Sequence, residues 1–233
     1  MIHAVILSHT NRENFPMVRQ LLESLRDETL PLEITLVESN LKAASEVPIG
    51  EALDRFSVRY VQPGKAFGFN EFLCEGILRS KARYLVSLNN DVNIRPGAIV
   101  ELVKGCEQYD VVSAYNPLSP VQPAMVAGIS PTDYFPGYRT SYQFSGWAWA
   151  ARADKLFKDH TLEHYFPHEL KFWFQDNFFM DCLKAEKKTQ ALCRRAEILH
   201  FENQSFDLLA DKHAMTEGQR DTYETLKRKR GYP

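Results

Sequence analysis

The feature that most constrains this chain is a regular alternation of two hydrophobic patterns over residues 2–114. Short apolar runs rich in β-branched residues are typical of buried strands, and the stretches between them carry apolar residues at helical spacing. The stretches at 15–25 and 69–77 are the clearest helices, whereas 41–56 is ambiguous because a proline and a glycine interrupt it. Strands that alternate with helices predict an α/β fold with parallel crossovers. The expected strands cover residues 2–8, 33–37, 57–61, 84–88 and 111–114.

The pattern changes after residue 114. Five prolines fall within 115–142, which predicts one long loop. Beyond it we expect an apolar strand in 144–151, a Phe- and Trp-rich segment, a strand near 196–199 and a charged C-terminal helix.

Length and composition exclude several classes of protein. The chain has 233 residues with 28 Lys+Arg and 30 Asp+Glu, so its net charge is −2. This length suits one domain or one domain with an appendage. An apolar content of 44% excludes a disordered or collagen-like protein, and the near-neutral charge argues against nucleic-acid binding by bulk charge alone.

The chain also lacks the usual signals for membranes and secretion. Its longest apolar runs are far shorter than the roughly 20 residues of a membrane span, and its N-terminus has no basic region before the first apolar run. Four scattered cysteines are typical of reduced thiols. We expect a soluble, cytoplasmic protein.

Three of the expected strands end in polar residues. These ends are Ser8-His9-Thr10, Glu38-Ser39-Asn40 and Asn89-Asn90-Asp91. Ligands of open α/β sheets bind outside the carboxyl ends of the strands, so three such ends predict a site for a polar ligand. The carboxylate of Asp91 suits Mg²⁺ or Mn²⁺, and the alternative is an Asx-rich turn without a ligand. Dinucleotide, P-loop, serine-hydrolase and zincin fingerprints are absent.

Several segments resemble family 2 glycosyltransferases with the GT-A fold. In chain order they are VILSHTNR, LVESN, GFNEFLCEGI and YLVSLNNDV, followed by Phe144–Arg152, Phe174–Asn177 and a late His200-x4-Ser205. The resemblance covers roughly residues 2–206. It implies a GT-A (Rossmann-like) α/β fold, a single domain with a mostly parallel central sheet flanked by helices. It further implies a nucleotide-sugar-binding half at 1–115, an acceptor-binding and catalytic half at 116–206, and a charged helical tail at 207–233.

The resemblance also implies roles for individual residues. Asp176 would be the general base, and Glu38 would contact the donor's base. Asp91 would hold Mn²⁺ or Mg²⁺, and His200 would join this metal site or contact the diphosphate. Two residues depart from the family pattern: Asn89 replaces an acid in the metal-binding triplet, and Gln175 replaces a common Glu. We therefore expect metal to bind mainly together with the donor. The implied donor-binding residues are Ser8, Thr10, Arg12, Glu38, Asn70, Asn89 and Asn90.

Aromatic residues of the second half have two interpretations. Trp147, Trp149 and Trp173 are candidate acceptor platforms, although tryptophans more often belong to a core. Aromatic neighbours of Asp176 are expected to raise its pKa toward that of a useful base, the alternative being a surface Asp that caps a helix.

A second group of candidate metal ligands lies between these aromatics. His160, His164 and His168 are spaced as on one helical face, but Pro167 and nearby glutamates favour a solvated face over a metal site.

The sequence thus predicts a metal-dependent, inverting glycosyltransferase that moves one sugar from a nucleoside-diphosphate sugar to a hydroxyl. The absence of the processive QxxRW signature favours transfer of a single sugar. The simplest acceptor is a saccharide or glycoconjugate. An alternative acceptor is a hydroxylated base in DNA, which the basic run Lys227–Arg230 permits. An alternative of another class is a non-catalytic nucleotide-sugar-binding protein. We expect no stable membrane insertion in either case.

Overall fold

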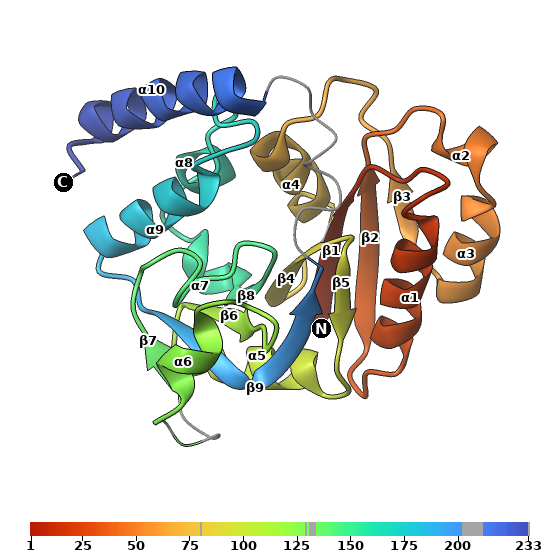
Figure 1. The fold of residues 1–233 in the computed structure, drawn as a ribbon, viewed down its shortest axis with the longest axis horizontal. Helices are drawn as coiled ribbons and strands as arrows, with labels where there is room; N and C mark the ends of the chain where they lie inside the picture. Colours follow the sequence, from red (N-terminus) through yellow and green to blue (C-terminus); the bar gives the residue numbers. More distant parts are fainter. Residues whose placement is uncertain (80, 129, 131–133, 202–211, 233) are drawn as a thin grey trace.

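Nine strands form one curled sheet in the described part of the chain (Figure 1). The computed structural model describes residues 1–79, 81–128, 130, 134–201 and 212–232. The strands are β1 (Ile2–Ser8), β2 (Leu32–Glu38), β3 (Arg59–Val61), β4 (Tyr84–Asn89), β5 (Val92–Ile94), β6 (Val111–Tyr115), β7 (Tyr134–Pro136), β8 (Ala148–Arg152) and β9 (Gln190–His200).

The first four strands in the sheet are parallel, as the sequence predicts. The strand order is β3-β2-β1-β4-β8-β6-β9-β5, and β7 pairs with β9. β6 and β9 are also parallel, whereas β8 runs antiparallel to both β4 and β6. β5 and β7 each pair with β9 in antiparallel orientation. The second half of the sheet is therefore mixed, because β8 enters it next to β4 from the opposite direction.

Helices cover both faces of this sheet. β1 is buried along its whole length, with Ile2, Ala4 and Ile6 facing one core and Val5 and Leu7 the other. Such two-sided burial explains its continuous apolar sequence. The helices are α1 (Phe15–Arg26), α2 (Ala43–Glu46), α3 (Ile49–Phe56), α4 (Phe69–Ile77), α5 (Ala98–Gly105), α6 (Gln122–Val126), α7 (Ala153–Leu156), α8 (Leu162–Tyr165), α9 (Gln175–Ala185) and α10 (Lys212–Arg230).

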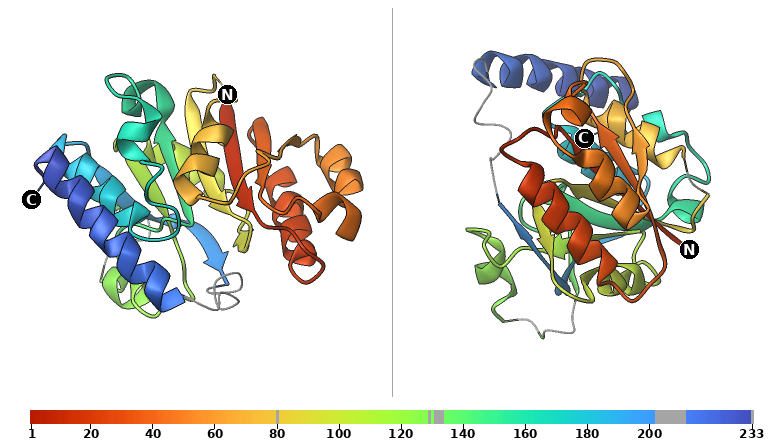
Figure 2. Two further views of the ribbon diagram at one scale, coloured as in Figure 1. Left: turned by 90° about the horizontal axis from the view of Figure 1, so that it is seen from above. Right: turned by 90° about the vertical axis from the view of Figure 1, so that its right-hand side faces the viewer.

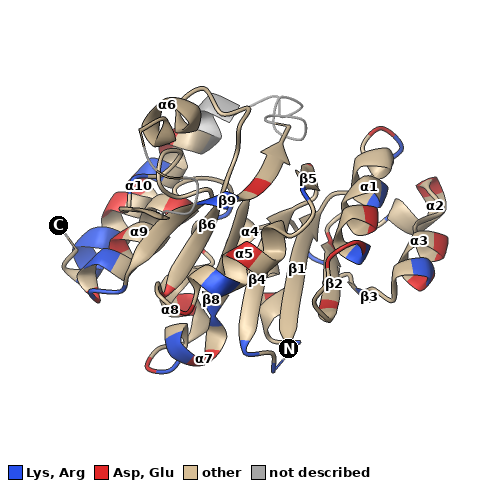
Figure 3. Cartoon of the chain, turned by 90° about the horizontal axis from the view of Figure 1, so that it is seen from below, with Lys and Arg blue, Asp and Glu red and all other residues tan. Residues whose placement is uncertain are grey.

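The C-terminal helix α10 lies along α9 at the edge of the molecule (Figure 2). Leu226 is buried against the second core, and the ring of Tyr223 stacks on Phe174 with 5.3 Å between centroids. The Tyr223 hydroxyl donates to Asp181 at 2.6 Å, and Lys227 pairs with the same carboxylate at 3.4 Å. The basic last turn of α10 stands out among the charged residues in Figure 3. No helix within the described ranges has the length and apolarity needed to cross a membrane.

One segment differs from expectation, and a second that the sequence leaves ambiguous is assigned by the structure. The proline-rich stretch 115–142, expected to be one long loop, contains α6 and β7. The ambiguous stretch 41–56 forms two short helices, α2 and α3. Strands from 1–115 and from 116–206 pair in one sheet, so the division into these halves and a tail from residue 207 stays a prediction.

Candidate active site

The carboxyl ends of β1 and β2 are joined around one buried carboxylate. Glu38 is fully buried and accepts hydrogen bonds from the backbone N–H of Thr10 at 3.0 Å and of Asn40 at 2.7 Å. The Asn40 side chain donates back to the Thr10 carbonyl at 2.6 Å. The parallel register that sets Ser8 beside Glu38 brings these residues together. Glu38 therefore fixes the two loops that leave this edge of the sheet.

The end of β4 joins the same network. Ser8 bonds Thr10 through their hydroxyls at 2.8 Å, and the amide of Asn90 donates to Ser8 Oγ at 3.1 Å. The backbone N–H of Asn89 donates to the Trp147 carbonyl at 2.9 Å, which extends the pairing of β4 with β8. The polar ends of three strands thus converge, as the sequence predicts. We call Ser8, Thr10, Glu38, Asn40 and Asn90 the strand-end network.

Asp91 and His200 lie side by side next to this network. β5 pairs with β9 so that Val92 faces His200, and this register brings Asp91 beside the histidine. His200 Nε2 lies 3.3 Å from Asp91 Oδ1, and the imidazole stacks on Trp147 with 4.8 Å between centroids. The pair comes from segments more than a hundred residues apart, so only the folded sheet assembles it.

The Asp91–His200 pair fits a divalent metal ion that shares its shell with a ligand. Asp91 Oδ1 and His200 Nδ1 are buried without a hydrogen-bond partner in the described structure. An octahedral ion with bonds of about 2.1 Å places neighbouring ligand atoms roughly 3 Å apart, close to the 3.3 Å observed between Nε2 and Oδ1. Two protein ligands leave the remaining positions to water or phosphate oxygens, which is how Mg²⁺ is usually held.

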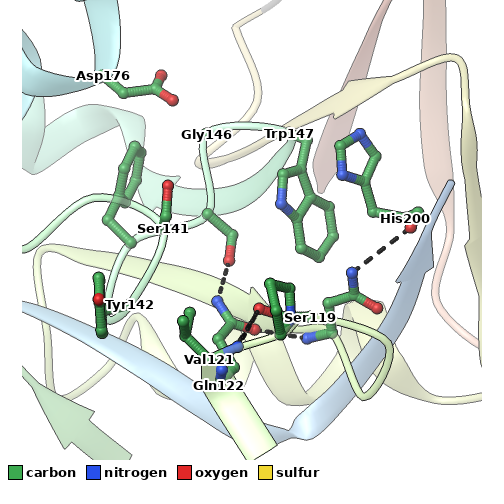
Figure 4. Close-up of a pocket in the computed structure, with 13 residues that line it drawn as sticks. Ser119, Val121, Gln122, Ser141, Tyr142, Gly146, Trp147, Asp176 and His200 are labelled. Atoms are coloured by element: carbon green, nitrogen blue, oxygen red, sulfur yellow. Dashed lines mark hydrogen bonds between the residues drawn. The ribbon is translucent and has the colours of Figure 1, made fainter. Parts of the chain in front are cut away.

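A pocket of about 350 Å³ opens beside His200 (Figure 4). Its wall is formed by residues 116 and 119–122, residues 141–142 and 144–147, Asp176 and His200. Trp147 and His200 form one side, and Asp176 projects from α9 on another. The pocket therefore lies between the second half of the chain and the Asp91–His200 pair.

Among the described residues, Asp176 is the one carboxylate on this pocket wall, and it has no hydrogen-bond partner there. It makes no hydrogen bond or ion pair within the described residues, and it caps no backbone N–H of α9. Burial alone raises its pKa to about 6, because the charged form loses its hydration there. The predicted rise in pKa is confirmed. Asp176 can thus accept a proton near neutral pH.

Gly146 makes the position of Asp176 possible. A Cβ atom on residue 146 would lie 2.0 Å from Oδ2 of Asp176, so any side chain there would displace the carboxylate. This contact joins the turn before β8 to the first turn of α9. Sequence reasoning placed Gly146 in a small-residue strand but did not pair it with Asp176.

The turn before α9 is held in an unusual backbone conformation. Phe174 has φ = 61°, the left-handed region that non-glycine residues rarely adopt. Its ring stacks on Tyr223, and the Arg220 guanidinium lies 5.8 Å from the ring centroid. Helix α10 thus packs over the residue that starts α9, two positions before Asp176.

The tryptophans separate into pocket and core. Trp147 lines the pocket, whereas Trp149 is 2% exposed and packs against the rings of Phe144, Phe166 and Phe179. Trp147 packs against the first core and Trp149 lies in the second, although residues two apart in a strand share a face, because Trp147 belongs to the turn before β8. Its burial corrects the expectation that it contacts an acceptor. Trp173 is half-buried and does not line this pocket.

Other predicted residues take different positions. Asn70 is buried, and its amide donates to the Pro167 carbonyl at 2.9 Å, so it tethers α4 to the segment after α8. Arg12 is exposed in the loop after β1. Contact of either residue with a donor stays a prediction. Ser205 lies outside the described residues.

Sequence reasoning missed a polar set at the base of the pocket. Gln122 accepts from the Asn116 backbone N–H at 2.8 Å and donates to Ser145 Oγ at 2.8 Å, and Ser145 donates to the Ala114 carbonyl at 2.9 Å. All three side chains are buried. Their signal was weak, because Asn116 and Gln122 lie among prolines and Ser145 within an apolar run.

Comparison with known proteins supports the fold. No protein-family model matches this sequence, and no curated protein sequence matches it either. Among solved structures, TarS from S. aureus (residues 1–349) matches with a TM-score of 0.59 and 15% identity, over 82% of this chain and 57% of that one. GalNAc-T7, solved with UDP, GalNAc and Mn²⁺, gives a TM-score of 0.67 and 12% identity over 86% of this chain and 43% of that one.

A third match is the mannosyltransferase PcManGT from Pyrobaculum calidifontis, solved with GDP-Man and Mn²⁺. Its TM-score is 0.62 at 11% identity, over 88% of this chain and 58% of that one. The chain has the fold of the GT-A glycosyltransferases. It spans about half the length of these structures.

Proposed function

We propose that this protein is a metal-dependent, inverting glycosyltransferase that moves one sugar from a nucleoside-diphosphate sugar to an acceptor hydroxyl. One observation carries the proposal. Asp176, a carboxylate with a pKa of about 6 and no hydrogen-bond partner among the described residues, shares a pocket with His200, which pairs with Asp91 at the sheet edge. Sugar transfer from a diphosphate needs a base for the acceptor hydroxyl and a metal ion for the leaving diphosphate. Asp176 can supply the base, and the Asp91–His200 pair can hold the ion.

The donor would bind along the carboxyl edge of the sheet. The strand-end network lies there, and ligands of open α/β sheets bind at this edge. Asp91 and His200 would hold Mn²⁺ or Mg²⁺, and the bound ion would neutralise charge that develops on the leaving diphosphate. The solved complexes of GalNAc-T7 with UDP and Mn²⁺ and of PcManGT with GDP-Man and Mn²⁺ support this choice of ligands.

The acceptor would enter the pocket between Trp147 and Asp176. The acceptor hydroxyl gives its proton to Asp176 while its oxygen attacks the anomeric carbon. The bond from that carbon to the diphosphate breaks, and the nucleoside diphosphate leaves with the electron pair. Attack from the face opposite the leaving group inverts the anomeric configuration. Trp147 would offer its indole to the acceptor sugar.

We favour a saccharide or glycoconjugate acceptor over a base in DNA. In the basic run on α10, Lys227 pairs with Asp181 and Arg230 contacts His164, so both charges are engaged within the protein. Net charge over the whole chain is −2. Two of the four basic side chains in the run are thus held within the protein, which weakens the case for contact with a phosphate backbone.

The test is a coupled assay of nucleoside-diphosphate release with a panel of donors, Mn²⁺ and two acceptor classes, saccharides and hydroxymethylated DNA. Wild-type protein is compared with Asp176→Asn and with Asp159→Asn, an exposed acid outside the site. We expect release with one donor, dependent on acceptor and lost only in Asp176→Asn. Donor binding without release from any donor–acceptor pair would favour the non-catalytic alternative.

A further inference from the structure

A second cluster of ligating side chains lies at the opposite end of α9 from Asp176. It consists of His160 before α8, His164 within α8, and Glu186 at the end of α9. One ligand atom from each residue lies within 4.8 Å of the others. His160 Nε2 is 3.5 Å from Glu186 Oε1, and His164 Nε2 contacts the same oxygen. We call these three residues the His-His-Glu cluster.

This set of atoms has the chemistry of a zinc site. Two imidazole nitrogens and one carboxylate are ligands that Zn²⁺ prefers, whereas Mg²⁺ and Ca²⁺ take mainly oxygen ligands. Tetrahedral zinc with bonds of about 2.1 Å places its ligand atoms roughly 3.4 Å apart, close to the His160–Glu186 distance of 3.5 Å. We propose that the His-His-Glu cluster binds Zn²⁺ or a similar divalent transition-metal ion, with water as the fourth ligand.

A neighbouring hydroxyl group fixes the orientation of the Glu186 carboxylate. The Tyr165 hydroxyl donates to Glu186 Oε2 at 2.6 Å, which leaves Oε1 directed at the two histidines. Such outer hydrogen bonds fix ligating carboxylates in metal sites.

Metal binding requires the two histidine rings to change their relative orientation. The rings of His160 and His164 are stacked, with 3.9 Å between centroids and 10° between planes. An ion in the plane of both rings requires one ring to turn. The side chain of His160 is 40% exposed, so it can turn without disturbing the core.

Metal binding at this cluster would also affect α10. Arg230 contacts His164 Nδ1, which accepts a hydrogen bond while Nε2–H faces Glu186. When Nε2 binds the ion, the ring proton must reside on Nδ1, where it opposes the guanidinium. Arg230 then has to leave. Removing the Arg230 charge should therefore tighten metal binding.

The cluster is separate from the proposed active site. Glu186 follows Asp176 by ten positions along α9, a rise of about 15 Å. Loss of one site can thus be distinguished from loss of the other.

The test is calorimetric titration of Zn²⁺ into the full chain with any affinity tag removed, supported by the visible absorption of bound Co²⁺. All variants carry His200→Ala, so that the Asp91–His200 pair cannot contribute. His160→Ala is the decisive change because this exposed side chain can be removed without loss of fold. Glu163→Gln, at an exposed acid of α8 three positions after His160, is the matched control.

We expect one Zn²⁺ per chain, an affinity at least tenfold weaker in His160→Ala, unchanged binding in Glu163→Gln, and binding several-fold tighter in Arg230→Ala. Co²⁺ should show tetrahedral bands that His160→Ala removes. Absence of stoichiometric Zn²⁺ binding, or equal affinity with and without His160, would overturn the proposal. Neither result depends on sugar transfer, so the proposed function is tested independently.

Discussion

Glu38 is fully buried and Asp176 lies partly buried on the pocket wall, and the hydrogen-bonding surroundings of the two carboxylates are opposite. Glu38 at the end of β2 accepts backbone N–H groups from Thr10 and Asn40. Asp176 at the start of α9 has no such partner in the part of the chain described, and burial raises its pKa to about 6. A carboxylate satisfied by backbone donors is a structural anchor, whereas one left without donors is available to take a proton.

The difference extends to the regions around them. The strand-end network is assembled from neighbouring parallel strands and is already hydrogen-bonded without a ligand. The pocket around Asp176 depends on contacts between distant segments, such as that of Gly146 with the carboxylate. We infer that the sheet edge is a rigid platform and that the chemistry belongs to the pocket.

Asp176→Asn tests this contrast most strongly. The amide keeps the shape of the side chain but cannot accept the acceptor's proton, so we expect transfer to fall by about 10²–10⁴-fold. Donor affinity should stay the same, because the strand-end network is intact. Steady-state rates and donor calorimetry on one preparation check both statements. A variant that retains more than a tenth of wild-type turnover would exclude Asp176 as the base.

Gly146→Ala should have the next largest effect. The new Cβ would overlap the Asp176 carboxylate, which must move, and we expect turnover to fall by about 10–100-fold through misplacement of the base. Gly218→Ala on α10 is the matched control, because a Cβ there meets no atom within 4 Å. Rates and thermal unfolding are measured for both. Equal rates in the two variants would show that the Gly146 contact does not position the base.

The pH dependence of transfer should follow Asp176. The base works when deprotonated, so kcat/KM should fall about tenfold per pH unit below its pKa of about 6 and level off above it. Measuring kcat/KM as a function of pH tests this fall at low pH. The variant Asp176→Asn should not show it. A wild-type profile that is flat from pH 5 to 7 contradicts the assignment.

Asp176 should also make the stability of the protein depend on pH. Folded Asp176 keeps its proton up to pH of about 6, whereas the unfolded residue loses it near 3.8, so the free energy of unfolding falls as pH rises between these values. The variant Asp176→Asn has no such group, so its free energy of unfolding should not fall in this way. The difference in free energy of unfolding between the variant and wild type should shift by about 2–3 kcal/mol in favour of the variant from pH 4 to pH 7. Denaturant unfolding at the two pH values checks this shift.

Glu38→Gln should have the smallest effect. We expect it to change the free energy of unfolding and the affinity for the donor. The new amide NH₂ would face a backbone N–H that a carboxylate oxygen now satisfies, at a cost of about 1–3 kcal/mol. Urea unfolding measures the cost, and Glu51→Gln on the exposed side of α3 is the control. If both variants unfold at the same urea concentration, Glu38 does not anchor the loops.

The first half of the fold was predictable from sequence because its strands are buried on both faces. β1, β2 and β4 follow the apolar runs closely, and α1 and α4 follow the helical spacing. β7 could not be predicted, since its three residues, two partly buried and one exposed, are held by pairing with β9 rather than by their own pattern. β9 itself extends well before the predicted 196–199.

The candidate site was predictable in the same uneven way. The convergence of Ser8, Glu38 and Asn90 follows from parallel strands, whose ends must meet at one edge. The contact of Gly146 with Asp176 depends on how α9 packs against the turn before β8, which no local pattern encodes. Trp147 and Trp149 have similar sequence surroundings, and only the packed structure separates pocket from core.

The most direct test of the central claim is calorimetric titration of nucleoside-diphosphate sugars, with and without Mn²⁺, into wild-type protein and Asp91→Ala. The account predicts that one donor binds, that its affinity falls at least tenfold without Mn²⁺, and that Asp91→Ala loses this metal dependence. Absence of binding from every donor to the folded protein, or binding indifferent to both Mn²⁺ and Asp91, would contradict a donor site at this edge of the sheet.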